Sequence, residues 1–311
     1  LNADISGIFA SDGFVRKRNF RGFEVCSFDE IKRQFPRFVV LLAFGSDRVE
    51  VLDNIKKLMS ECEFYAPYIP LFENEFPSET YLKENEDDIS RIYSLLADET
   101  SRRVFECVLK YRHTANPGYL FDCETEIPEA YRNILKLSPD EIFLDVGAYR
   151  GDTVAEFMSF AGGYRKIYAC EPNVKTFRKL EEYARLQKNM EFVNCFVSNE
   201  NSFVNFDFKH GRGSCAASLG DKVKAQTIDS LLSTEPVSFI KIDSEGEEKN
   251  VIDGAKNTIL SHRPKLRIAA YHRPCDIIDI PKQVLSIRSD YKMYLRHNPA
   301  VPDWNTDYYF V

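Results

Sequence analysis

Glu141-Ile142-Phe143-Leu144-Asp145-Val146-Gly147-Ala148-Tyr149-Arg150-Gly151-Asp152-Thr153 is the stretch that decides the fold. Its first part is an apolar run that contains one carboxylate, Asp145, and its second part holds Gly147 and Gly151. A short apolar run bounded by turn residues predicts a strand buried on both faces. Glycines directly after such a strand let backbone N–H groups approach a ligand without obstruction from a Cβ. The stretch therefore predicts a strand, a glycine turn and a helix that together hold a ligand.

Beyond this stretch, short apolar runs alternate with helical patterns to the end of the chain. A period of two at Phe203–Phe208 indicates a further strand outside the main sheet. The alternation predicts an α/β fold with an open twisted sheet, Rossmann-like, that binds ligands at the carboxyl ends of its strands. The strands of the main sheet are expected at Ile142–Val146, Lys166–Cys170, Phe192–Val197, Val237–Asp243, Leu266–Tyr271, Met293–Leu295 and Tyr308–Val311.

The chain divides by pattern into three parts. Residues 1–75 alternate strands and helices, with a capping box at Ser27–Glu30 and a strand at Phe38–Phe44, and predict a small parallel-sheet unit. This unit is interpreted as an incomplete Rossmann-like domain. Residues 76–135 predict a helical connector, and residues 136–311 predict the ligand-binding domain.

Bulk composition excludes several classes of protein. The 311 residues are 44% hydrophobic and 29% charged, which is ordinary for a globular protein, and no apolar run is long enough to cross a bilayer. The net charge of −7 argues against a nucleic-acid partner. The eight cysteines are scattered without a Cys-x-x-Cys pair, so neither a zinc site nor a disulfide framework is expected. No signal peptide is visible, and a reduced cytoplasm is the expected setting.

The charge of the residues in the glycine turn indicates which kind of ligand it binds. A dinucleotide-binding turn has the pattern G-x-G-x-x-G, and the three positions here hold Asp145, Gly147 and Arg150. Asp145 would repel a pyrophosphate, which disfavours an NAD(P)-dependent oxidoreductase. It suits a ligand with an ammonium and a sulfonium centre, and S-adenosylmethionine has both. Glu171 lies twenty residues beyond Gly151, at a strand end where a carboxylate accepts hydrogen bonds from ribose hydroxyls.

Several motifs together resemble the FkbM-type S-adenosylmethionine-dependent methyltransferases, over roughly Pro139–Val311. They are Asp145-x-Gly147-Ala148-x-x-Gly151-Asp152-Thr153, Glu171-Pro172, Thr227-Ile228-Asp229, Ile240-Lys241-Ile242-Asp243-x-Glu245-Gly246-x-Glu248 and Tyr271-His272. The resemblance implies that residues 136–311 form a domain of the class I methyltransferase type. It also implies transfer of a methyl group to a hydroxyl oxygen of a saccharide, glycolipid or related metabolite, with S-adenosylhomocysteine as product.

The same resemblance implies which residues hold the cofactor. The turn after the first strand would hold its methionine part, Glu171 its ribose, and the turn at Ser198 would lie near its adenine. The expected cofactor-binding residues are Asp145, Gly147, Ala148, Tyr149, Gly151, Asp152, Thr153, Glu171, Pro172, Ser198 and Asp243.

The catalytic candidates are Asp243, Glu245, His272 and Lys241. Asp243 and Glu245 end a strand that is expected to neighbour the first one, and His272 follows the next strand, so the three converge by topology. A hydroxyl is a weak nucleophile and benefits from a positioned base, for which Glu245 and His272 are both open. Lys241 shares a strand face with Asp243 and needs a carboxylate partner in an apolar strand. The alternative for this group is an ion-pair network that ties strands together.

The sequence also bears on a metal ion, on the partner and on two polar loops. Asp243, Glu245 and His272 offer ligands for Mg²⁺ or Mn²⁺, but no dense ligand motif is present and no metal is expected. The partner is expected to be a small-molecule or glycan acceptor, and a non-catalytic cofactor-binding module is the alternative. The loop His210–Ser214 is a candidate lid on the acceptor, and Arg16–Arg18 a candidate phosphate contact.

Overall fold

The computed structural model describes residues 5–11, 19–68, 79–185, 187–207, 215–216 and 221–311. The candidate lid at His210–Ser214 and the basic cluster at Arg16–Arg18 lie outside these described residues. No helix in the described ranges is both long enough and apolar enough to cross a bilayer.

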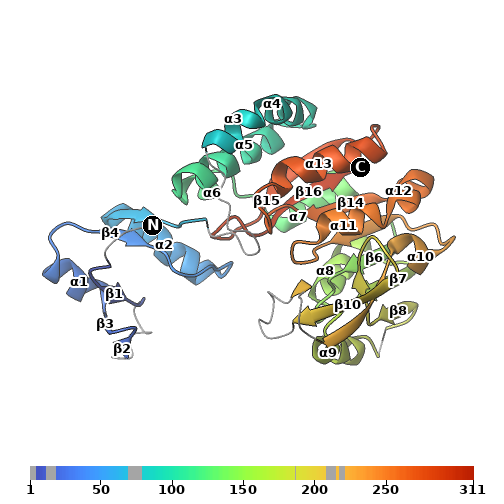
Figure 1. The fold of residues 1–311 in the computed structure, drawn as a ribbon, viewed down its shortest axis with the longest axis horizontal. Coiled ribbons are helices and arrows are strands. Elements are labelled where there is room, and N and C mark those ends of the chain that lie inside the picture. Colours follow the sequence, from blue (N-terminus) through green and yellow to red (C-terminus); the bar gives the residue numbers. More distant parts are fainter. Residues whose placement is uncertain (1–4, 12–18, 69–78, 186, 208–214, 217–220) are drawn as a thin grey trace.

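A seven-stranded sheet in the order β15-β16-β14-β13-β6-β7-β8 forms the centre of the fold (Figure 1). The strands β6, β7, β8, β13 and β14 run parallel, and β16 is antiparallel to both β14 and β15. The strand order reverses between β6 and β13, where such sheets bind ligands. The strands are β6 (Ile142–Val146), β7 (Lys166–Cys170), β8 (Met190–Val193), β13 (Phe239–Ile242), β14 (Lys265–Ala269), β15 (Met293–His297) and β16 (Thr306–Phe310).

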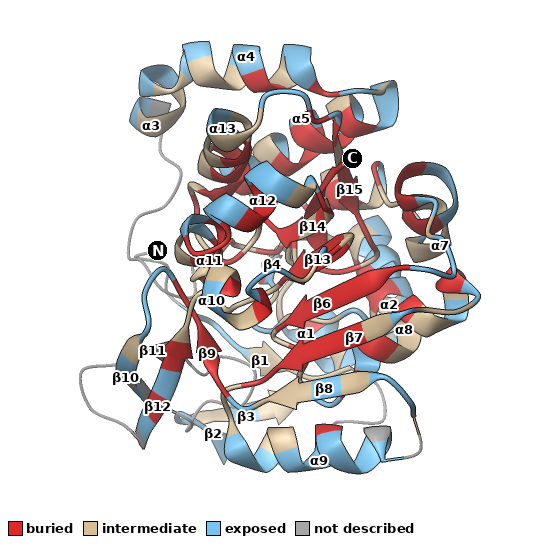
Figure 2. Cartoon of the chain, turned by 90° about the vertical axis from the view of Figure 1, so that its right-hand side faces the viewer, coloured by how far each residue is buried: buried red, intermediate tan, exposed pale blue. Residues whose placement is uncertain are grey.

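The sheet separates two apolar cores. Alternate residues of β6 face opposite sides, so Leu144 belongs to one core and Phe143 to the other. Phe143 stacks on Phe157 of α8 at 4.4 Å and on Phe239 of β13 at 4.8 Å between ring centroids. Figure 2 shows β6 buried, whereas the outer face of α9 is exposed. The expectation of a strand buried on both faces is confirmed, and so is the α/β fold class.

Helices cover both faces of this sheet. α8 (Asp152–Ala161), α9 (Val174–Ala184) and the π-helical turn η1 (Ala130–Leu135) contribute to the Phe143 side. The other side is covered by α10 (Ile228–Leu232), α11 (Glu248–Asp253), α12 (Lys256–His262) and α13 (Asp276–Ile287). Short polar side chains begin several helices, as Asn173 does for α9, where its carboxamide oxygen accepts from the N–H groups of Lys175 and Thr176.

A separate four-stranded sheet has the order β11-β10-β12-β9. Its strands are β9 (Phe196–Val197), β10 (Ser202–Asp207), β11 (Cys215–Ala216) and β12 (Asp221–Gln226). β10 pairs antiparallel with both β11 and β12. The period of two at Phe203–Phe208 therefore predicted a strand outside the main sheet correctly.

The N-terminal part differs from the expected single parallel sheet. Parallel pairs form between β1 (Ile8–Phe9) and β3 (Phe23–Cys26) and between β4 (Val39–Leu41) and β5 (Glu63–Tyr65), but in two separate sheets. β2 (Asn19–Phe20) joins the first of them. The helices are α1 (Phe28–Gln34), with the predicted capping box at Ser27, and α2 (Val49–Glu61). β4 is shorter than the predicted strand because, within the described residues, it pairs with β5 alone, which leaves Val39 and Leu41 exposed.

The connector packs against the C-terminal half of the large sheet. Its helices are α3 (Glu79–Glu84), α4 (Glu86–Leu95), α5 (Glu99–Thr114), α6 (Gly118–Phe121) and α7 (Ile127–Glu129). One buried core includes Val40 of β4, Val104 of α5 and Phe310 of β16. Apolar packing therefore runs from the N-terminal part through the connector to the end of the chain, although Figure 1 shows β1 to β4 standing to one side of the large sheet.

Candidate active site

A tight turn follows β6 and is pressed against the end of β13. Gly147, Tyr149 and Gly151 have φ angles of 77°, 46° and 90°, all in the left-handed region. The Gly147 N–H donates to the Cys170 carbonyl of β7 at 3.1 Å. A Cβ on Gly147 would lie 1.9 Å from the carbonyl oxygen of Asp243. This position therefore requires glycine for its backbone angle and for its close approach to β13.

A buried lysine connects the ends of β6 and β13. Lys241 lies opposite Asp145 in the register of the two strands, which confirms that they are neighbours. Its Nζ lies 3.4 Å from Asp145 Oδ1 and 3.5 Å from Asp243 Oδ2, and it donates to the Gly147 carbonyl at 3.2 Å. The predicted pairing of Lys241 with carboxylates is confirmed.

Burial and charge act against each other at this trio. Burial raises the pKa of Asp145 to about 6, although Lys241 lowers it. Burial would raise the pKa of Asp243 as well, but Lys241 and His272 hold it below its ordinary value. Burial would lower the pKa of Lys241, yet the two carboxylates raise it above its ordinary value. Lys241 and Asp243 are therefore both charged at neutral pH.

Glu171 extends from the end of β7 toward the glycine turn. Its Oε2 accepts from the Tyr149 N–H at 3.1 Å, and its Oε1 accepts from the Asn173 N–H at 2.8 Å. Burial raises its pKa to about 7 against the lowering effect of these two hydrogen bonds. Each carboxylate oxygen can accept more than one hydrogen bond, so the backbone holds Glu171 in place and leaves acceptor capacity.

His272 lies at the centre of a cluster of carboxylates. Its Nδ1 is 3.0 Å from Glu248 Oε1, and its Nε2 is 3.5 Å from Asp243 Oδ1 and 3.6 Å from Glu245 Oε2. Glu248 is itself buried and accepts from the Ser244 N–H at 2.7 Å. The cluster joins the turn after β13 to the loop after β14.

The carboxylates decide the charge of the imidazole. Burial would lower the pKa of His272, but Glu248, Asp243 and Glu245 raise it to about 10. Burial raises the pKa of Glu245 to about 7, against the lowering effect of His272. At neutral pH His272 is therefore an imidazolium without a lone pair on its ring nitrogens, whereas Glu245 is present in both its protonated and its deprotonated form.

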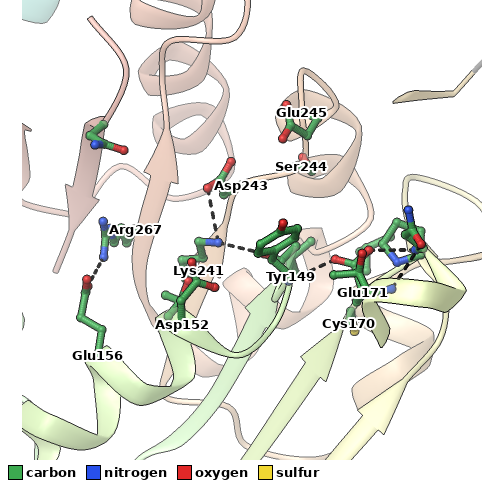
Figure 3. A pocket seen from close by; sticks show the side chains of 18 of the residues that line it. Tyr149, Asp152, Glu156, Cys170, Glu171, Lys241, Asp243, Ser244, Glu245 and Arg267 are labelled. Carbon is green, nitrogen blue, oxygen red and sulfur yellow. Dashed lines mark hydrogen bonds and ion pairs between the residues drawn. The ribbon is translucent and has the colours of Figure 1, made fainter. Parts of the chain in front are cut away.

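A pocket of about 340 Å³ opens at this edge of the sheet (Figure 3). In this view Glu171 lies on one side of Lys241 and Asp243, and Arg267 with Glu156 lies on the other. The predicted residues that line the pocket are Gly147, Tyr149, Asp152, Thr153, Glu171, Pro172, Lys241, Asp243 and Glu245.

The remaining predicted residues, all of them described by the structure, lie behind the pocket wall. Asp145 and Ala148 are fully buried. His272 is buried too, and its Nε2 lies close to the carboxylates of Asp243 and Glu245. Gly151 shapes the turn, and Ser198 follows Val197, which does line the pocket. These residues do not line the pocket themselves but lie next to residues that do.

Eight polar residues of the wall were not predicted from the sequence, and three of them, Asn173, Thr176 and Ser244, lie within a few positions of predicted residues. The other five lie elsewhere. They come from the loop after β4, from α8, from β14 and from the loop before β16, and they are Asp47, Glu156, Arg267, Asn298 and Asn305. One of them carried a signal, because a charged residue in the apolar run Leu266–Tyr271 needs a partner as Lys241 does. Arg267 indeed donates to Glu156 and to Asp307, both at 2.7 Å.

Among the described residues, one group has the ligand types and spacing for a metal ion. It consists of Asp243, Glu248 and His272, with ligand atoms within 4.8 Å of one another. A metal ligand must be an unprotonated imidazole nitrogen, whereas the surrounding carboxylates hold the pKa of His272 at about 10. An ion would therefore have to displace a proton that the cluster binds strongly, and the expectation that no metal is used stays a prediction.

Residues 145–293 match the sequence model of a family described as the methyltransferase FkbM domain. Among solved structures, the chain is similar to the crystal structure of methyltransferase FkbM from Methylobacillus flagellatus KT. The TM-score is 0.77 and the identity 24%, over 98% of this chain and 83% of that chain. This likeness bears on the fold, and it agrees with the class I methyltransferase sheet predicted from the sequence.

More distant likenesses cover about three fifths of the chain. One is to precorrin-6y C5,15-methyltransferase from Geobacter metallireducens GS-15, with a TM-score of 0.36 and 14% identity over 59% of this chain and 85% of that chain. Another is to Aeropyrum pernix fibrillarin with natively bound S-adenosyl-L-methionine, with a TM-score of 0.36 and 18% identity over 56% and 67%. Scores this low carry no argument. No curated protein sequence matches the chain.

Proposed function

We propose that the protein transfers a methyl group from S-adenosylmethionine to a hydroxyl oxygen of a saccharide, glycolipid or related metabolite. The proposal starts from the match of residues 145–293 to the methyltransferase FkbM domain. The position of Glu171 carries the proposal. It stands at the end of β7 beside the glycine turn, with one backbone N–H on each carboxylate oxygen and acceptor capacity left for two ribose hydroxyls.

The charge of the pocket fits this cofactor. Asp152, Glu171, Asp243 and Glu245 all line the wall, and S-adenosylmethionine carries an ammonium and a sulfonium centre. The wall from Gly147 to Thr153 would hold the methionine part and Glu171 the ribose. The apolar residues Phe196 and Val197, directly before Ser198, would face the adenine.

The chain's own residues then have to place a hydroxyl and remove its proton. When bound, the cofactor supplies a methyl group that the sulfonium sulfur makes electrophilic. The acceptor oxygen forms a bond to this carbon as the carbon–sulfur bond breaks, and the hydroxyl proton passes to a base. Glu245 is the proposed base, because it lines the pocket and its pKa is about 7. His272, an imidazolium at this pH, would orient Glu245 and Asp243.

The same charges support a small, uncharged acceptor. The wall carries six acidic side chains and two basic ones, Lys241 and Arg267, so it would repel a phosphate backbone, and the whole chain has a net charge of −7. We therefore propose that nucleic acid is not the acceptor.

Calorimetry distinguishes this cofactor from a dinucleotide. S-adenosylhomocysteine should bind the protein with a micromolar dissociation constant, because it shares the ribose and most of the methionine part, and NAD should not bind. Binding of NAD with no binding of S-adenosylhomocysteine would contradict the proposal and favour the oxidoreductase alternative.

Methyl transfer distinguishes an enzyme from a binding module. Methyl-labelled S-adenosylmethionine is offered with a panel of neutral glycans and glycolipids to the wild type, to Glu245→Gln and to Glu200→Gln. Glu200 is an exposed residue of the loop after β9 that does not line the pocket, so it is the matched control. The wild type and the control should label a panel member and Glu245→Gln should not. Cofactor binding without any labelling would support a non-catalytic module.

A further inference from the structure

We infer that Asp47, Asn298 and Asn305 form an acceptor-recognition wall for a neutral, polyhydroxylated molecule. The inference rests on the proposed function and adds to it the part of the chain that selects the acceptor. None of the three residues lies in the family match, which spans residues 145–293, yet all three line the same pocket as Asp243 and Glu245.

A short bridge brings the N-terminal part of the chain to this pocket. The Ser46 N–H donates to the Val301 carbonyl at 2.7 Å, and the Val301 N–H donates to the Ser46 carbonyl at 2.9 Å. Beside the bridge, Gly45 packs so closely on Trp304 that an added Cβ would lie 2.4 Å from the indole ring. Asp47 is the next residue after this bridge, so its position at the pocket is set by contacts on the loop before β16.

Asn298 presents a buried acceptor that has no partner. It is 2% exposed, and its Nδ2 donates to the Thr125 carbonyl at 2.9 Å. This bond fixes the orientation of the carboxamide, so the other atom is the oxygen. Within the described chain, Asn298 Oδ1 is buried without a hydrogen-bond donor. An unsatisfied buried acceptor is unfavourable, and a hydroxyl group that enters the pocket would satisfy it.

The other two side chains add hydrogen-bonding capacity. Asn305 has a φ of 61°, which asparagine tolerates, and its carbonyl accepts from the Asn298 N–H at 3.0 Å. Asp47 is exposed. Neither the Asp47 carboxylate nor the Asn305 carboxamide takes part in a hydrogen bond or ion pair among the described residues, and both line the pocket. The wall therefore offers acceptor oxygens to a ligand rich in O–H donors.

The charged residues that line the pocket argue against an anionic acceptor. The lining has two cations, and both are already paired. Lys241 lies beside Asp145 and Asp243, and Arg267 is bound by the Glu156 and Asp307 carboxylates at 2.7 Å each. Asp47 adds a further negative charge. In Figure 3, Arg267 and Glu156 lie on the side of Lys241 away from Glu171, the residue proposed for the ribose. With the ribose assigned to the Glu171 side, the Arg267 side is left for the acceptor in this proposal, and its paired charges suit neutral hydroxyl groups.

The test compares two wall variants with matched controls. Asp47→Ala and Asn305→Gly remove the side chains, and glycine keeps the left-handed backbone at position 305. Asp53→Ala is the control for an exposed acid on the neighbouring helix α2, and Asn189→Gly is the control for an asparagine with a φ of 58° that does not line the pocket. All five proteins are first titrated with S-adenosylhomocysteine, which should bind each of them equally.

Acceptor recognition is then measured without turnover. Saturation-transfer NMR on the S-adenosylhomocysteine-loaded proteins uses neutral methyl glycosides and the same glycosides carrying a sulfate group. The wild type and both controls should transfer saturation to a neutral glycoside and not to its sulfated form, and the two wall variants should lose most of the signal. For any acceptor that the wild type methylates, the wall variants should raise KM about tenfold and leave kcat within about twofold.

Two results would overturn the inference. One is an equal neutral-glycoside signal in Asp47→Ala, Asn305→Gly and the wild type. The other is the absence of signal from every neutral glycoside in the wild type, or a preference for the sulfated forms. Failure of the proposed function looks different, because it is a loss of S-adenosylhomocysteine binding or of labelled methyl transfer, and the saturation-transfer measurement depends on neither turnover nor the base.

Discussion

His272 is held by Asp243, Glu245 and Glu248, and its charge is part of what keeps these carboxylates together. His272→Gln should therefore lower the free energy of unfolding by about 3 kcal/mol at pH 6, because it leaves buried carboxylates without a counter-ion. Urea unfolding measures this loss. His113→Gln, at an exposed position of α5, is the control and should change little. An equal stability of the two variants would mean that the cluster does not depend on the imidazolium.

The same residue predicts how stability depends on pH. The folded protein raises the pKa of His272 to about 10 from its ordinary value of 6.5. The proton is bound more tightly in the folded state, so its contribution is fully present below about pH 6.5 and is lost as pH rises through 10. The difference in unfolding free energy between the wild type and His272→Gln should shrink over this range. A difference that grows with pH would contradict a protonated His272.

Glu245 predicts the pH dependence of the reaction. Its pKa is about 7, and a base acts in its deprotonated form. The value of kcat should rise with pH through about 7 and then level. Glu245→Gln should lose this rise together with a factor of about 10² to 10⁴ in kcat, whereas Glu200→Gln should keep both. A rise that survives in Glu245→Gln would assign the base to another group.

At the scale of the element, the turn after β6 is the part that tolerates change least. Gly147 and Gly162 both have left-handed φ angles, of 77° and 68°, but a Cβ meets the Asp243 carbonyl at Gly147 and open space at Gly162. Alanine at either position should destabilise the protein by about 1–2 kcal/mol through the backbone angle. Only Gly147→Ala should also weaken S-adenosylhomocysteine binding, by at least about tenfold, in calorimetry. Equal affinities would show that the close approach to β13 does not shape the pocket.

Strand pairing explains why the charged residues of the site could be predicted in part. Lys241 and Asp145 are separated by 96 positions, but each interrupts an apolar run, and a charge in such a run needs a partner. Parallel strands with adjacent carboxyl ends then bring Asp243 to the glycine turn. Patterning within each element therefore predicted the turn, the Lys241 pair and most strands of the main sheet. The single strand expected at Phe192–Val197 was wrong, because the chain divides there into β8 of the main sheet and β9 of the separate sheet. Patterning could not place Glu248, because a glutamate in a helix is normally exposed and this one is 1% exposed.

At the scale of the whole molecule, the connector is tied to the site by a buried arginine. Arg112 of α5 donates to Asp303 at 2.7 Å, to the Pro274 carbonyl at 3.0 Å and to the Ala270 carbonyl at 3.1 Å. The domain boundaries near residues 75 and 135 stay a prediction. These bonds nevertheless couple α5 to the loops after β14 and before β16.

Arg112→Met should therefore destabilise the whole protein. It leaves the fully buried Asp303 without its cation, which should lower the free energy of unfolding by about 3–5 kcal/mol. Urea unfolding followed by circular dichroism measures the loss. Arg103→Met, at an exposed position of the same helix, should change it by less than about 0.5 kcal/mol. Comparable losses would mean that the helix, and not the ion pair, sets the effect.

The sequence by itself determined the class of fold, the glycine turn and the ends of β6 and β7, because these follow from local apolar patterns and backbone angles. Only the tertiary structure decided the charge of His272 and the membership of Asp47, Asn298 and Asn305 in the pocket wall. Charge depends on burial and on carboxylates that converge through space, and the wall joins segments about 250 positions apart. Neither quantity is encoded in the pattern of one element.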